Sequence, residues 1–119
     1  MKHQAKRYKL GRTTNHRASL WYNLVRSLAL HGRIVTTDAK AKSMIPIAEK
    51  LVTLAKDESL SAYRSLIAQM RGDETAAKKL REYGEKFKDR NGGYISIVKI
   101  GQRKGDAAHQ SCVMFVENN

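Results

Sequence analysis

Hydrophobic positions between residues 14 and 31 recur every three or four residues, which is the period of an α-helix with one buried face. Thr14 or Asn15 can cap the first turn by accepting hydrogen bonds from its free backbone N–H groups. Gly32 can end the helix, because glycine adopts a positive φ at little cost. The expected buried face consists of Trp21, Leu24, Val25 and Leu28.

The hydrophobic period changes directly after this helix. Residues 33–37, RIVTT, form a short segment rich in β-branched side chains, which favours a strand. Residues 38–56 return to helical spacing. Pro46 lies inside that pattern, where it removes a backbone donor and crowds the preceding turn. We therefore expect either a kink near Ser43 or a broken helix.

Two further helices are predicted before the pattern changes again. Residues 59–70 carry apolar side chains at helical spacing and are closed by Gly72. Asp73 can cap the next helix, for which Gly84 is the expected end. Together with the two earlier helical segments, these predict four helices.

The last third of the chain has the composition of strands. Residues 94–100, YISIVKI, and 112–116, CVMFV, are expected to pair antiparallel, with residues 101–111 forming a mobile loop that exposes Arg103 and Lys104. The short strand at 33–37 can add a third, because an isolated hairpin is marginal in water. The predicted fold class is α+β in two layers, with a small, mostly antiparallel three-stranded sheet packed against helices.

Charge changes this picture more than any other property. The chain of 119 residues carries a net charge of +12 and has a pI near 10.1, so its expected partner is a polyanion, nucleic acid first and an anionic membrane second. Residues 1–42 hold ten Lys or Arg against one acid. We expect a basic N-terminal arm at 1–13, poorly ordered alone, and a single domain at 14–119.

Other features suggest a cytosolic, soluble protein. No uncharged run approaches the roughly 18 to 20 apolar residues of a membrane span, and no apolar segment of a signal peptide follows the basic start. The single cysteine, Cys112, excludes an internal disulfide, and on a strand it is expected to be a small core residue.

Candidate chemistry is sparse. The histidines and Cys112 form no spacing typical of metal ligands, and no phosphate-binding loop occurs, so no metal or cofactor is expected. A small ribonuclease could use His16 and His31 as base and acid, but such residues occur by chance in any basic protein. We expect no enzymatic activity.

Binding to RNA phosphates is the better-supported hypothesis, with an affinity that falls steeply with salt. Lys78, Lys79 and Arg81 are more simply an ordinary solvated helix face, because glutamates lie nearby. The candidate RNA-binding residues are Lys2, His3, Lys6, Arg7, Tyr8, Lys9, Arg12, Thr14, Asn15, His16, Arg17, Arg26, Arg33, Thr37, Lys40, Lys42, Arg103 and Lys104.

Short motifs along the whole chain occur in a characteristic order and spacing. They are KLGR at 9–12 with HR at 16–17, NLV at 23–25, HGRI at 31–34, TT at 36–37, KAK at 40–42, AEKL at 48–51 with LAK at 54–56, GGY at 92–94 and RKGDA at 103–107. With these motifs the chain resembles the bacterial large-subunit ribosomal protein family numbered seventeen. It departs from that family's usual residues at Tyr22, Val35, His109 and Met114.

The resemblance implies a structural protein of the large ribosomal subunit, in the cytoplasm, that binds ribosomal RNA near the polypeptide exit and touches neighbouring ribosomal proteins. It implies the order helix, strand, three helices and two strands, with the basic arm and the first helix as the principal RNA contact. No membrane contact and no homo-oligomer are expected. A free-standing basic nucleic-acid-binding regulator remains the alternative.

Overall fold

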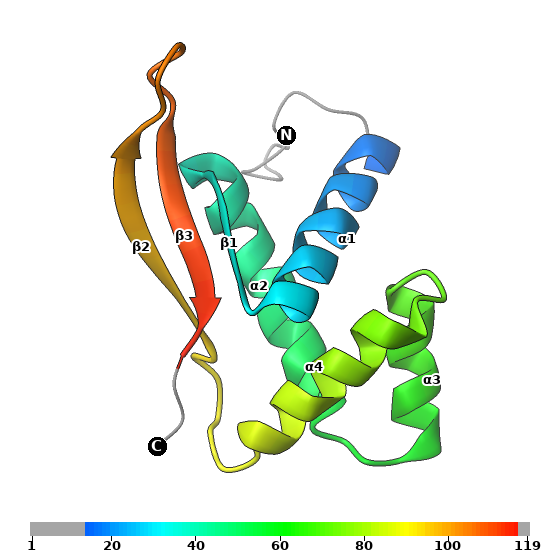
Figure 1. The fold of residues 1–119 in the computed structure, drawn as a ribbon. Coiled ribbons are helices and arrows are strands. Elements are labelled where there is room, and N and C mark those ends of the chain that lie inside the picture. The colour runs from blue at the N-terminus through cyan, green and yellow to red at the C-terminus, as the bar shows by residue number, and fades with distance from the viewer. Residues whose placement is uncertain (1–13, 117–119) are drawn as a thin grey trace, which may run out of the picture.

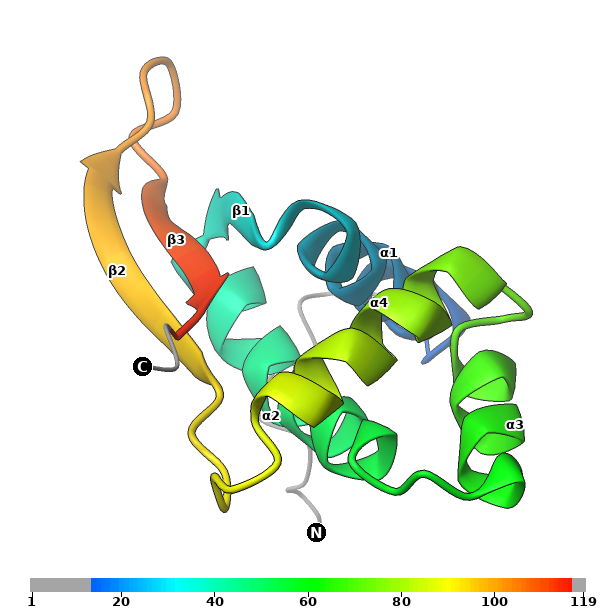
Figure 2. The same cartoon turned by 60° about the horizontal axis from the view of Figure 1, so that its bottom comes forward.

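The computed structural model describes residues 14–116, and the side chains of residues 18–116. A sheet forms one side of the molecule and helices cover one of its faces (Figures 1 and 2). This arrangement confirms the predicted α+β fold and its element order. The elements are α1 (Thr14–His31), β1 (Arg33–Thr37), α2 (Asp38–Ala55), α3 (Leu60–Gln69), α4 (Glu74–Lys86), β2 (Ile95–Gln102) and β3 (His109–Phe115).

The sheet has the strand order β1-β3-β2, and both pairs are antiparallel. Its central strand is therefore the last one in the sequence. Val35, Cys112 and Val98 lie opposite one another in a row across the three strands. The β2–β3 hairpin extends beyond the helical layer (Figure 1).

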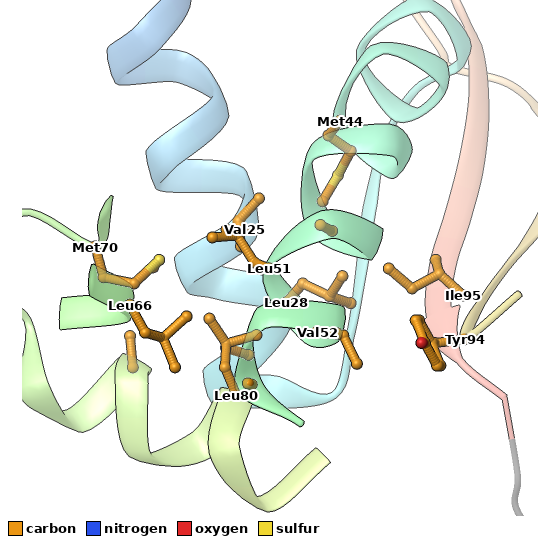
Figure 3. Packing of buried hydrophobic residues seen from close by; sticks show 14 of the residues in the cluster. Val25, Leu28, Met44, Leu51, Val52, Leu66, Met70, Leu80, Tyr94 and Ile95 are labelled. Atoms are coloured by element: carbon orange, nitrogen blue, oxygen red, sulfur yellow. The ribbon is translucent and has the colours of Figure 1, made fainter. Parts of the chain in front are cut away.

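Helix α2 lies at the centre of the molecule, between the sheet and the other helices. Its buried face includes Met44, Ala48 and Val52, each with no exposed surface. Side chains from α1, from α4 and from the start of β2 surround this face (Figure 3). Burying each large apolar side chain contributes about 1.5–3 kcal/mol, so α2 links the two layers energetically.

Pro46 does not break α2, so the broken-helix alternative is wrong. The helix continues from Asp38 to Ala55 with Pro46 inside it. Both Pro46 and Lys42, whose carbonyl loses its helical donor, are exposed. That carbonyl lies on a face open to water, which makes the missing hydrogen bond tolerable.

The prediction that Gly84 ends the fourth helix is also wrong, because α4 continues to Lys86. Gly84 is buried against the end of α2, where a Cβ on it would lie 2.7 Å from the backbone carbonyl carbon and oxygen of Ala55. The glycine therefore allows close helix packing.

The loop between the last two strands is shorter than the expected 101–111. Gly101 pairs with Gln110 and Gln102 with His109 after a register shift, so the ladder extends through polar residues that carry no apolar signal. Cys112 was expected in the core and is instead half-buried. It lies between the exposed Val35 and Val98, in the same row across the sheet. None of the helices in residues 14–116 covers this face of the sheet (Figure 2).

Candidate nucleic-acid interface

The N-terminal ends of α1 and α2 and the tip of the β2–β3 hairpin lie toward the same side of the molecule, uppermost in Figure 1. Helix N-termini carry partial positive charge and free N–H groups that attract anions. Thr37 is the N-cap residue of α2 with extended backbone, and its side chain makes no capping hydrogen bond. Lys40 and Lys42 follow in the first turns of that helix. The structure thus places three of the predicted RNA-binding residues, Thr37, Lys40 and Lys42, at the N-terminal end of α2.

Asp38 is the acid closest to this group. Ser111 Oγ donates a hydrogen bond to Asp38 Oδ1, and Lys99 Nζ lies 3.8 Å from its other oxygen. The Ser111 hydroxyl and, to a smaller extent, Lys99 and Lys42 lower the pKa of Asp38. Its charge is thereby engaged by β2 and β3 and binds α2 to the sheet.

Arg33 lies apart from the group around Thr37. It begins β1 and is exposed, opposite Met114 on the uncovered face of the sheet. At about 3.3 Å per residue, the length of the strand separates it from Thr37 by roughly 13 Å. An RNA that contacts both Arg33 and Thr37 must therefore span the length of β1.

Arg26 has an intramolecular partner that the sequence did not reveal. Its Nε donates to Asp73 Oδ2 at 2.6 Å, and Asp73 also caps α4 by accepting from the Ala76 N–H at 3.1 Å. The hydrogen bond and charge of Asp73 raise the pKa of Arg26. Arg26 joins α1 to α4, so RNA contact by this residue would compete with a tertiary bond.

Replacing Asp73 by alanine should lower the thermal unfolding midpoint at pH 7. The Ala76 N–H and the Arg26 guanidinium hold the pKa of Asp73 below its ordinary value. A depressed carboxylate stabilises the fold above its unfolded pKa of about 3.9, and this contribution is lost as pH falls through the folded-state pKa. The midpoint difference from the parent protein should therefore shrink below about pH 4 in calorimetry. Asp89→Ala, at an exposed turn position, is the control, and a pH-independent difference would contradict the prediction.

The hairpin tip is ordered by its own side chains. Arg103 Nε donates to Asp106 Oδ1 at 3.0 Å and its Nη2 contacts the other oxygen, while the Ala108 N–H also donates to Asp106. The guanidinium is the main cause that lowers the pKa of Asp106 to about 2. Arg103 is thus engaged within the tip, which leaves exposed Lys104 as the cation presented outward.

The remaining candidates lie at the start of the chain. For those in the first turn of α1 only the backbone is described, and it places them at the helix N-terminus: Thr14, Asn15, His16 and Arg17. Those in the arm lie outside the described residues: Lys2, His3, Lys6, Arg7, Tyr8, Lys9 and Arg12.

The exposed face of α4 has the mixed character expected of a solvated surface. Lys79 Nζ lies 3.8 Å from Glu82, and the Arg81 guanidinium lies 4.4 Å from the centre of the Tyr63 ring. A cavity of about 390 Å³ between α4 and the end of α2 is lined by charges of both signs, including Lys56 and Glu85. This mixture makes the face a poor phosphate site.

No catalytic or metal constellation emerges from the part of the chain that the structure describes. Among residues 18–116, whose side chains the structure describes, no group of three or more His, Cys, Asp or Glu is placed to hold a metal ion. His16 is in the first turn of α1 and His31 is its last residue, about 22 Å apart along the helix axis, too far to act on one phosphate. None of the helices in the described region combines the length and apolarity that a membrane crossing requires.

These features define a small, basic α+β protein with the attributes of a polyanion-binding module. The sequence model of the family described as "Ribosomal protein L17" matches residues 20–116. The "Large ribosomal subunit protein bL17" of Trichlorobacter lovleyi is 46% identical, over 98% of this chain and 94% of its own length. The protein of the same name in Dictyoglomus turgidum is 45% identical, over 98% of this chain and 100% of its own length. The one in Carboxydothermus hydrogenoformans is 48% identical, over 85% of this chain and 90% of its own length. The chain belongs to the ribosomal protein L17 family.

Membership of this family makes the chain a structural, non-catalytic constituent of the large ribosomal subunit, located with the ribosome in the cytoplasm. Family membership contradicts the ribonuclease hypothesis, since the family is not enzymatic. No observation on the molecule favours the alternative of a free-standing regulator.

Proposed function

We propose that this protein binds ribosomal RNA within the large subunit, with the basic arm and the starts of α1 and α2 as its principal contact. The observation that carries the proposal is the concentration of charge. Residues 1–42 hold ten Lys or Arg against one acid, Asp38, and that acid is engaged by Ser111 and Lys99. The location near the polypeptide exit and the contacts with neighbouring ribosomal proteins rest on the family resemblance alone.

Recognition would depend mostly on RNA shape and phosphate geometry. Lys40 and Lys42 supply charge at the start of α2, and the Thr37 hydroxyl, which makes no capping bond, is available to a phosphate oxygen. Lys104 at the hairpin tip can reach a second segment of the RNA phosphate backbone. The folded body fixes the spacing of these groups, and the arm adds further cations.

Removing three predicted contacts together should weaken binding to large-subunit ribosomal RNA far more than removing three cations elsewhere. The test variant is Arg12→Ala/Arg17→Ala/Arg33→Ala, and the control with the same charge change is Lys78→Ala/Lys79→Ala/Lys88→Ala. Each lost phosphate contact should reduce the slope of log affinity against log salt by about 0.7 to 0.9. Filter binding at several salt concentrations measures both affinity and slope, and equal losses in the two variants would refute the assigned interface.

Incorporation into the subunit is tested separately. In sucrose gradients of cell lysate, the protein should remain in the large-subunit and intact-ribosome fractions after a high-salt wash, because the folded body contributes contacts beyond the electrostatic ones. Migration at the top of the gradient at both low and high salt would overturn the proposal.

A further inference from the structure

A cavity of about 190 Å³ opens between α1, α2 and the end of α3, away from the sheet. Buried Val25 and Met70 form part of its floor and approach each other from α1 and from the end of α3 (Figure 3). It exceeds the roughly 30 Å³ of a water molecule but is smaller than the roughly 300–1,000 Å³ of typical drug-sized sites. This size suits a single planar ring system.

Two aromatic side chains of α1, both half-buried, line the cavity. The Trp21 indole Nε1 donates to Ser43 Oγ at 3.1 Å, and Ser43 in turn donates to the Lys40 carbonyl at 2.9 Å. These bonds fix the indole against α2 and leave part of its ring at the cavity. Tyr22 lines the same cavity beneath the guanidinium of Arg71, 5.3 Å from the centre of its ring.

Arg71 is held in an unusual backbone conformation. Its φ is 54°, in the left-handed region that side chains other than glycine rarely adopt. Its Nη1 donates to Ser19 Oγ at 3.2 Å, so the exposed guanidinium is held against one face of α1 by Ser19 and by the Tyr22 ring one turn further along. Backbone strain of this kind persists where the surroundings hold it and is often found at binding sites.

The lining carries one charge, that of Arg71, and no acid. Gln69 at the rim adds one amide that both donates and accepts hydrogen bonds. The cavity begins at Ala18, only about 6 Å along the helix axis from the start of α1 at Thr14. An RNA strand bound at that helix start would pass the mouth of the cavity.

We propose that this cavity receives one unstacked base of an RNA strand, with the base against Trp21 and Tyr22, its edge toward Gln69 and its phosphate toward Arg71. Aromatic faces and guanidinium planes are the usual platforms for bases removed from a helix. The proposal rests on the RNA-binding function above and adds a contact that reads a base rather than the backbone.

The chain contains a single tryptophan, so its fluorescence reports directly on the cavity. The full-length protein is titrated with a 12-nucleotide single-stranded RNA of mixed sequence and with an abasic ribose-phosphate strand of the same length. Trp21 emission should be quenched by the RNA and little changed by the abasic strand. The RNA should also bind about 5- to 140-fold more tightly in anisotropy measurements, the range that stacking of one base supplies.

A filling substitution tests the cavity without changing charge. Ala18→Leu introduces a side chain at the exposed rim and should abolish the preference for RNA over the abasic strand, while Ala68→Leu, at an exposed position on α3 outside the cavity, should retain it. Arg71→Lys keeps the charge but loses the planar fork that can hold a phosphate by two hydrogen bonds, and should weaken the binding of both strands by a similar factor. Circular dichroism confirms that each variant is folded.

The outcomes separate this inference from the function on which it rests. Equal affinity and equal quenching with both strands, or an unchanged preference in Ala18→Leu, would overturn the base site while leaving phosphate binding intact. Failure of both strands to bind at low salt would also overturn the base site, and failure of large-subunit ribosomal RNA to bind under the same conditions would overturn the RNA-binding function as well. A shift of Trp21 emission in the free protein on deletion of residues 1–13 would show that the arm occupies the cavity, which also overturns the base site.

Discussion

Replacing Phe87 by alanine should lower the free energy of unfolding by about 3–5 kcal/mol, the usual cost of removing a large buried aromatic ring. Phe87 follows α4 and has no exposed surface. Its ring centre lies 5.5 Å from that of Tyr94, 6.2 Å from Phe115 and 6.3 Å from Tyr83. The ring therefore joins the end of α4 to the sheet. Urea denaturation followed by circular dichroism at pH 7 measures the loss.

Leu60 provides the matched control for this experiment. It is also a large apolar residue, but it is 61% exposed at the start of α3. Leu60→Ala should change the free energy of unfolding by no more than about 0.5 kcal/mol. If the two substitutions had similar costs, the aromatic cluster could not be what holds α4 against the sheet.

Gly84→Ala should destabilise the protein by about 1–3 kcal/mol, although alanine is ordinarily the better helix former by about 1 kcal/mol. The added Cβ would lie 2.7 Å from backbone atoms of Ala55 and 2.9 Å from the backbone nitrogen of Lys56. Backbone cannot rotate away as a side chain can, so α2 and α4 must separate. Thermal and urea unfolding measure the cost.

Ser65→Ala is the control for helix propensity, because Ser65 is exposed within α3. It should be neutral or slightly stabilising, since alanine loses less conformational freedom in a helix. A Gly84→Ala protein that matched or exceeded the parent in stability would mean that the two helices can move apart freely.

The sequence was sufficient to predict the elements and the fold class, because hydrophobic period is a local property that each segment carries on its own. The ends of elements were less well predicted where a contact distant in sequence decides them. Gly84 has the appearance of a helix end, and only the proximity of Ala55 explains why the helix continues past it. Pro46 likewise looks like a break until its exposed position is known.

The same distinction applies to the candidate interface. The concentration of cations at the start of the chain is visible in the sequence, but their availability is not. Arg26 binds Asp73, which is 47 residues away. Arg103 binds Asp106 only because the hairpin tip folds back on itself. Tyr22 and Arg71 were not among the predicted RNA contacts, because the cavity they line exists only after α1 packs on the end of α3.

The strand order has a consequence for synthesis of the chain. β1 and β2 are made first, but each pairs only with β3, which is made last. Until β3 is available, both earlier strands present open edges that can pair with other chains, and the sheet side of α2 stays uncovered. The helices can collapse while translation continues, whereas the sheet must close near its end. A nascent chain that stops before residue 109 would thus be an aggregation hazard rather than a shorter working protein.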